Sequence, residues 1–106
     1  MEQMRQGDVF LERVVSDQLP AGSKLVPQDA GRVVLAYGEV TGHAHAIRGE
    51  DAQLFQQPHT KERFLRIVRE TDLRHEEHGP IHLSPGLYVV RTQREYTPGA
   101  IRPVLD

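Results

Sequence analysis

The segment Ser84-Pro-Gly-Leu-Tyr-Val-Val-Arg-Thr92 decides the expected fold of this 106-residue chain. It opens with a Ser-Pro-Gly turn and continues as a run rich in apolar and β-branched residues. Side chains two residues apart point to the same side of an extended chain, so Leu87 and Val89 would lie opposite Tyr88. The pattern predicts a β-strand over residues 87–96.

Turn residues followed by short apolar segments recur along the chain. Nine glycines and seven prolines fall between short apolar segments, which is typical of strands joined by turns. Residues 31–37 are apolar on both faces, which predicts a central strand covered on both sides. The other strands are expected over residues 8–15, 44–47, 52–56, 63–69, 73–77 and 81–83, with a short extended piece at 25–26. The predicted fold class is mainly β with little helix, a small single-domain β-barrel or sandwich.

Residues 60–70 leave an alternative open. Thr60 could cap a helix whose buried stripe would be formed by Phe64, Leu65, Ile67 and Val68. The β-branched residues and the turns on both sides favour a strand instead.

Length and charge bound the class of protein. A chain of this size supports one modest core, which we expect to span residues 1–96. Residues 97–106 carry two prolines and four apolar residues, which predicts an extended tail packed on the domain or on a neighbouring subunit. Thirteen basic residues against fifteen acidic ones give a formal charge of −2, without the basic excess typical of nucleic-acid proteins.

The chain has no cysteine, which excludes a disulfide scaffold, a cysteine zinc finger, an iron–sulfur cluster and a cysteine nucleophile. Any metal would have to bind histidines and carboxylates. No apolar run approaches the roughly 18 residues that span a bilayer, and the N-terminus lacks the apolar core of a signal peptide. We therefore expect a soluble, cytoplasmic protein with no membrane partner.

Five of the six histidines fall in two short windows. In the first, His43 and His45 are two residues apart, so a strand would present their imidazoles side by side at a spacing that one ion can bridge. Two imidazoles hold a divalent ion weakly, and a third ligand is needed. Glu50 follows five residues later. His59 stands in a polar loop and is expected to be incidental.

The second window, residues 74–82, supplies further candidate ligands. On a strand, His75 and Glu77 would share one face, with Glu76 and His78 on the other; ligation by both histidines would need a bulge or a helical turn. Gly79-Pro80 leaves the direction of His82 undetermined, so His82 could replace either histidine. Gly79-Pro80 would also end a helix, which argues against the helical zinc-protease motif.

The first window resembles the first motif of the cupin family. That motif runs from a glycine through His-x-His to a glutamate, and here Gly38 is followed by His43-Ala-His45 and Glu50, with one residue fewer. The resemblance implies a cupin-like metal-binding fold. In the second cupin motif a ligand histidine follows a proline and a glycine, whereas here Tyr88 follows Pro85-Gly86. The whole chain is also similar to short bacterial and phage-encoded proteins with like histidine runs, which implies no activity.

The leading hypothesis is a protein that binds one divalent ion, Zn, Fe, Mn or Ni, in a histidine-rich site. The candidate ligands are His43, His45, His75, His78 and Glu50. Whether the site is catalytic stays open; if it is, the metal would act as a Lewis acid or bind oxygen, and Glu77 or Glu76 would serve as the base.

The alternative hypothesis is a non-catalytic homo-oligomeric module that contacts RNA or protein through histidine and arginine surfaces. In that interpretation the histidines serve an interface, and residues near the C-terminus matter more than a metal: Arg91, Arg94, Tyr96 and Arg102. A homo-oligomer is expected under either hypothesis.

Overall fold

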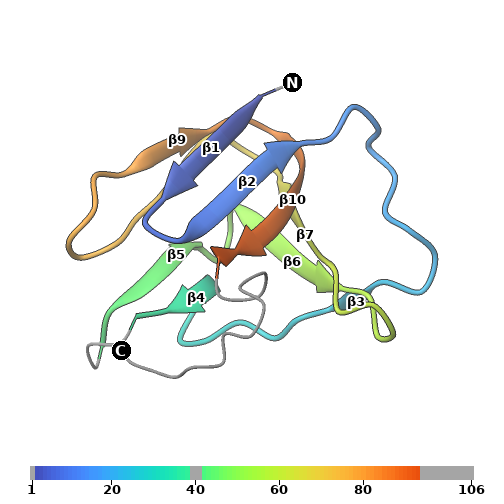
Figure 1. The fold of residues 1–106 in the computed structure, drawn as a ribbon, viewed down its shortest axis with the longest axis horizontal. Helices are drawn as coiled ribbons and strands as arrows, with labels where there is room; N and C mark the ends of the chain where they lie inside the picture. The colour runs from blue at the N-terminus through green and yellow to red at the C-terminus, as the bar shows by residue number, and fades with distance from the viewer. Residues whose placement is uncertain (1, 39–41, 94–106) are drawn as a thin grey trace.

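Extended strands joined by turns make up a small, mainly β domain with almost no helix (Figure 1). This computed structural model describes residues 2–38 and 42–93. Within them the strands are β1 Gln3–Gln6, β2 Val9–Arg13, β3 Lys24–Leu25, β4 Arg32–Tyr37, β5 Ala44–Arg48, β6 Ala52–Gln56, β7 Arg63–Ile67, β8 Thr71–Leu73, β9 Ile81–Leu83 and β10 Gly86–Thr92. The predicted mainly β class is confirmed.

The larger sheet has six strands in the order β1-β2-β10-β7-β6-β3, and its neighbours run antiparallel. β10, the strand with the strongest sequence signal, lies inside this sheet between β2 and β7. Its Tyr88 and Val90 are buried, as alternation requires for a strand with one face on the core. The Tyr88 hydroxyl donates a hydrogen bond to the Ser84 carbonyl at 2.7 Å, which satisfies the polar end of this buried ring.

Two hairpins complete the fold, β4–β5 and β8–β9. An antiparallel bridge between Ala46 and Arg74 joins them, with backbone hydrogen bonds of 2.9 and 3.0 Å in the two directions. This bridge holds the chain that leaves β8 beside β5. Among the described residues the sheets are not closed into a barrel.

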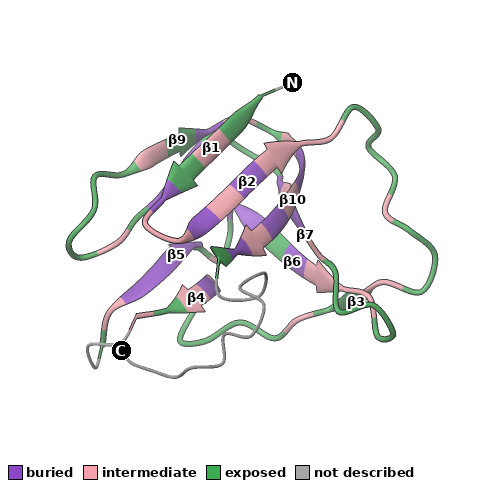
Figure 2. Ribbon diagram, in the orientation of Figure 1, coloured by how far each residue is buried: buried purple, intermediate pink, exposed green. Residues whose placement is uncertain are grey.

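One hydrophobic cluster lies between the large sheet and the hairpins. Leu11, Leu65 and Tyr88 enter it from the large sheet, and Leu35 and Leu73 enter it from the hairpins. Buried positions alternate with more exposed ones along β4 and β8, whereas β5 is buried over four consecutive residues, 44–47 (Figure 2). Burial of these side chains, worth roughly 1.5–3 kcal/mol each, is what fixes the hairpins against the sheet.

Several sequence expectations are corrected. β1 was not anticipated, because residues 3–6 carry a single apolar side chain. The strand expected over 73–77 is β8, Thr71–Leu73, and the second histidine window runs through the following loop into β9. β4 is not a central strand, since among the described strands it pairs with β5 alone. The helical alternative is wrong, because β7 occupies that segment. The tail at 97–106 lies outside the described residues.

Candidate metal centre

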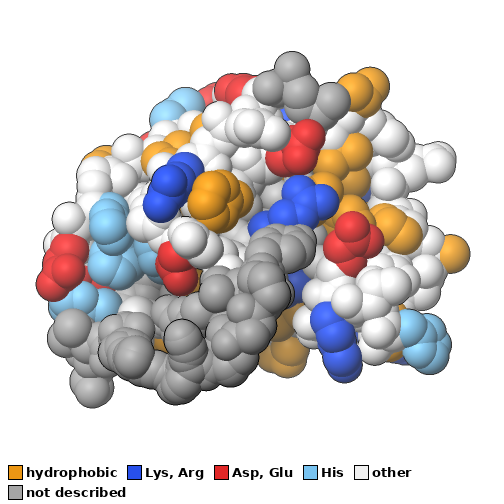
Figure 3. Space-filling model, in the orientation of Figure 1, with side chains coloured by type: hydrophobic (Ala, Val, Ile, Leu, Met, Phe, Trp, Pro, Cys, Tyr) orange, Lys and Arg blue, Asp and Glu red, His pale blue; other side chains and the backbone are white. Residues whose placement is uncertain are grey.

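Four imidazoles from the two histidine windows lie together at one end of the fold. His43 and His45 stand at the start of β5, and His75 and His78 stand in the loop between β8 and β9. The ring centroid of His75 lies 4.3 Å from that of His45, 4.6 Å from that of His78 and 5.6 Å from that of His43. Figure 3 shows histidine side chains gathered at one end of the molecule beside acidic side chains. The two windows are 30 residues apart in sequence and meet because of the Ala46–Arg74 bridge.

The spacing of the rings fits a shared ion. Imidazoles bound tetrahedrally at a metal–nitrogen distance of about 2.0–2.1 Å have centroids about 5 Å apart. Potential ligand atoms of His43, His75 and Glu76 lie within 4.8 Å of one another. Two imidazoles and a carboxylate form a donor set that suits a first-row transition metal.

Glu76 joins this group although strand parity placed it on the face opposite His75. The chain has left β8 by this point, so strand parity no longer applies, and the Ala44 backbone N–H donates to Glu76 Oε1 at 2.9 Å. That hydrogen bond is the main cause that lowers the pKa of the Glu76 carboxyl, with the nearby His43 and His75 adding to it. Glu76 is thus held as a carboxylate. Sequence reasoning named Glu76 among the candidate ligands of the second window and as a possible base, and did not include it in the leading ligand set.

His45 is the buried member of the cluster, and Gln6 sets its tautomer. The Gln6 side-chain amide donates to the carbonyls of Leu73 and Gly79, both at 2.9 Å, so its oxygen must be the atom that faces His45 Nδ1, also at 2.9 Å. Nδ1 therefore carries the ring proton. The His45 Nε2 lone pair is left as the acceptor or metal-binding atom, 3.7 Å from Asp8 Oδ1.

Electrostatics keeps this imidazole neutral. His45 is 4% exposed, and burial is the largest cause that lowers its pKa, followed by the neighbouring His75. The Asp8 carboxylate opposes the shift. A neutral histidine with its Nδ1–H donated to a fixed acceptor is the form in which a histidine ligates a metal through Nε2.

His75 occupies the opposite tautomer in its neutral form. Its Nδ1 accepts a hydrogen bond from the backbone N–H of Glu77 at 3.0 Å, so Nε2 carries the proton. Ligation through either nitrogen would require this hydrogen bond to open or the proton to leave. Glu77 itself is largely exposed, and its Oε2 lies 3.7 Å from His43 Nδ1.

Two glycines allow the backbone to approach the imidazoles closely. Gly7, in the β1–β2 turn with φ +58°, would as alanine place its Cβ 2.8 Å from His78 Nε2 and 3.1 Å from His45 Cε1. At Gly38 a Cβ would lie 3.0 Å from the His43 Cβ. These contacts are tighter than an added side chain normally tolerates, so small residues here are a condition for the cluster.

Two predicted candidates are not part of the group. Glu50 follows the far end of β5, which at about 3.3 Å per residue lies about 16 Å along the strand from His43, and it pairs there with Arg48. His82 lies on β9, where it contacts Glu70 and Asp72 instead. The structure brings neither of them to the four imidazoles.

The fold and this cluster define a small β-domain with a histidine and carboxylate centre at one end. The chain belongs to the family described as a domain of unknown function (DUF8820), whose model matches residues 5–93. No curated protein and no solved structure matches the chain. Among the described residues, none of the helical structure has the length and apolarity needed to cross a bilayer.

Proposed function

We propose that the protein binds one divalent metal ion in the imidazole cluster. The ligands are His43, His75 and Glu76. The His45 ring lies beside that of His75, with its Nε2 facing Asp8. The observation that carries the proposal is the convergence of four imidazoles and one hydrogen-bonded carboxylate from two separate segments. A mixed nitrogen and oxygen donor set of this kind suits Zn, Fe, Mn or Ni.

The same proposal includes a cupin-like fold, which is a finer assignment than the mainly β class. The His-x-His pair at the start of β5 is the part of the cupin-like first motif that lies in the cluster; the motif's glutamate, Glu50, lies outside it, and the other ligands come from the loop between β8 and β9. If the site is catalytic, Glu77 is the proposed base. Its exposed carboxylate lies next to His43, where it could take a proton from a molecule bound at the site. When bound, the metal would supply Lewis-acid chemistry.

Metal content tests the proposal directly. The protein is purified without an affinity tag, incubated with each of the four metals, dialysed, and analysed by elemental mass spectrometry. We expect about one ion per chain in the wild type, and loss of at least nine tenths of it in the His43→Ala/His75→Ala double variant.

His59→Ala serves as the matched control, since His59 is exposed in the loop between β6 and β7. It should retain the full metal content. Circular dichroism verifies that each variant is folded. A wild-type protein that retains none of the four metals would overturn the proposal, as would a folded double variant with unchanged metal content.

A further inference from the structure

A cavity of about 350 Å³ opens beside the candidate metal centre and is lined by three arginines. Its residues come from β4, β5 and the segment after β8: Arg32, Arg48 and Arg74 together with Ala44 and Ala46. At one end it reaches His75 and Glu76. We call this cavity the arginine groove.

The strand register explains why the guanidinium groups gather here. Arg32 lies directly opposite Arg48 in the β4–β5 pair, and Arg74 lies opposite Ala46 at the bridge to the next hairpin. Ala44, Ala46 and Arg48 alternate onto the same face of β5, and the two alanine methyls leave space between the longer side chains.

This arrangement costs stability in the free protein. Like charges directly opposite each other in an antiparallel pair are destabilising. Arg32 is half-buried, and within residues 2–38 and 42–93 its side chain makes no hydrogen bond or ion pair. The backbone of Arg32 pairs with Asp29, whose carboxylate accepts a hydrogen bond from the Tyr37 hydroxyl, so among the described residues no carboxylate is bound to the Arg32 guanidinium.

The other two arginines have exposed side chains that already form ion pairs. Arg48 pairs with Glu50, and Arg74 pairs with Asp72 at 3.2 Å. Both arginine side chains are about seven tenths exposed, and ion pairs at that exposure contribute little because water screens them. A ligand anion can therefore displace these carboxylates at small cost.

The geometry points to a binding site for a small organic or inorganic anion in the arginine groove. Guanidinium groups bind the oxygens of a carboxylate or phosphate in pairs, and a cavity of this size lies at the lower end of small-molecule sites. A ligand held there by its oxyanion would direct its other end toward His75 and Glu76. Binding itself does not depend on a metal; only this orientation rests on the proposed function.

Nuclear magnetic resonance titration of the full chain tests the site, with succinate and inorganic phosphate as the two probes at constant ionic strength. We expect saturable amide shifts at Arg32, Ala46, Arg48 and Arg74, in chelator-treated as well as zinc-loaded protein. The probe that binds more tightly assigns the oxyanion as carboxylate or phosphate. In the Arg32→Gln/Arg48→Gln variant the dissociation constant should rise at least tenfold.

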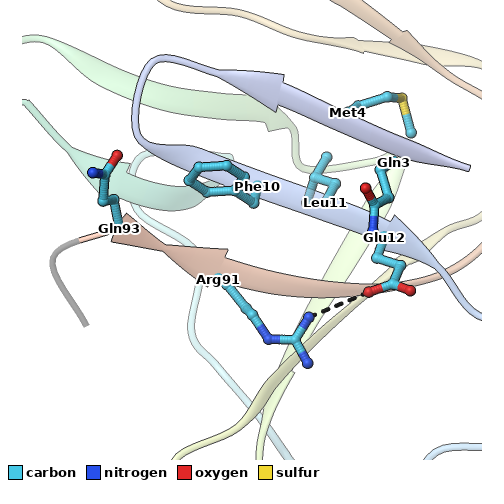
Figure 4. A pocket seen from close by; sticks show the side chains of 7 residues that line it. All are labelled: Gln3, Met4, Phe10, Leu11, Glu12, Arg91 and Gln93. Atoms are coloured by element: carbon cyan, nitrogen blue, oxygen red, sulfur yellow. Dashed lines mark hydrogen bonds and ion pairs between the residues drawn. The ribbon is translucent and has the colours of Figure 1, made fainter. Parts of the chain in front are cut away.

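Arg91→Gln is the matched control. Arg91 pairs with Glu12 at 3.4 Å in a different groove of about 310 Å³, formed by β1, β2 and β10 (Figure 4). This variant should bind both probes as the wild type does. If anion binding is weakened equally in the control and in the double variant, the inference is wrong. It is also wrong if neither succinate nor phosphate shifts the amide resonances.

Three further outcomes are decisive. If single-stranded RNA shifts these resonances and neither small anion does, the groove is a nucleic-acid surface and the inference is wrong. If His43→Ala/His75→Ala loses metal but still binds the anion, the groove stands independently of the metal centre. If the Arg32→Gln/Arg48→Gln variant still binds metal but no longer binds the anion, the metal centre is likewise independent of the arginine groove.

Discussion

Two histidines in this small domain show how differently the same side chain can be used. His45 is buried in the imidazole cluster and has Gln6 as its hydrogen-bond partner. His82 is exposed on β9 and contacts the carboxylates of Glu70 and Asp72. Burial lowers the pKa of His45, whereas hydrogen bonds to Asp72 and then Glu70 raise the pKa of His82.

The difference lies in what surrounds each ring. A neutral amide and low exposure favour the uncharged imidazole of His45, which keeps a lone pair for a metal. Two carboxylates favour the imidazolium of His82, which has no lone pair to give. The clustered histidine is thus prepared for ligation, and the isolated one forms an ion pair with its neighbours.

The largest expected effect on stability comes from removing the hydrogen-bond partner of His45. Gln6→Ala would leave the His45 Nδ1–H and the carbonyl of Leu73 buried without partners, and such losses cost roughly 1–3 kcal/mol each. We expect the free energy of unfolding to fall by about 3 kcal/mol, measured by urea denaturation. Gln3→Ala, at an exposed position of the same strand, is the control and should change it by less than about 0.5 kcal/mol. Similar losses in both variants would show that the Gln6 network carries no special stability.

The second effect is a pH dependence of stability due to His45. The pKa of His45 is lowered in the folded protein. As the pH falls through the ordinary pKa of 6.5, the unfolded chain therefore binds a proton at this histidine while the folded chain does not. Stability from this group is present above that value and is lost as the pH falls toward the lowered folded pKa, at up to about 1.4 kcal/mol per pH unit. In metal-free protein, His45→Gln should show a shallower acid decline of the urea midpoint than the wild type. Parallel declines would contradict this assignment.

The smallest effect concerns His82, whose shift has the opposite sign. Because its pKa is raised, its contribution is fully present below 6.5 and is lost as the pH rises through the folded value. The side chain is exposed, so the contribution to stability is small. Asp72→Asn removes the largest cause and should lower the pKa of His82, followed through its ring protons by nuclear magnetic resonance. An unchanged titration curve in the variant would rule out the pairing as the cause.

The sequence patterns predicted most strands because their signals are local. Apolar alternation and Gly-Pro turns are properties of short segments, and β10, β6 and β7 lie where these patterns placed them. The same patterns missed β1, whose pairing with β2 comes from backbone hydrogen bonds and not from an apolar face. They also extended β8 into the loop that holds His75, since strand propensity does not tell where pairing ends.

The histidines of the candidate site could be predicted from the sequence, but the residues that hold them in place could not. The four clustered histidines stood out by composition alone, and the structure gathers their rings into one group. Gln6 carried no signal, because it is 39 positions from His45 in a polar segment. Glu50 had the spacing of a motif, but β5 carries it to the far end of the strand. Arg94, Tyr96 and Arg102 of the alternative hypothesis lie outside the described residues.

The sequence by itself determined the mainly β class, the restriction of any metal to histidine and carboxylate ligands, and the residues from which a centre could be drawn. These follow from side-chain chemistry and from two-residue periodicity, which need no knowledge of distant segments. Only the tertiary structure decided which histidines meet, which tautomer His45 adopts, and that three arginines share a groove next to them. Those properties depend on the Ala46–Arg74 bridge and on strand register, which bring together residues that no local pattern connects.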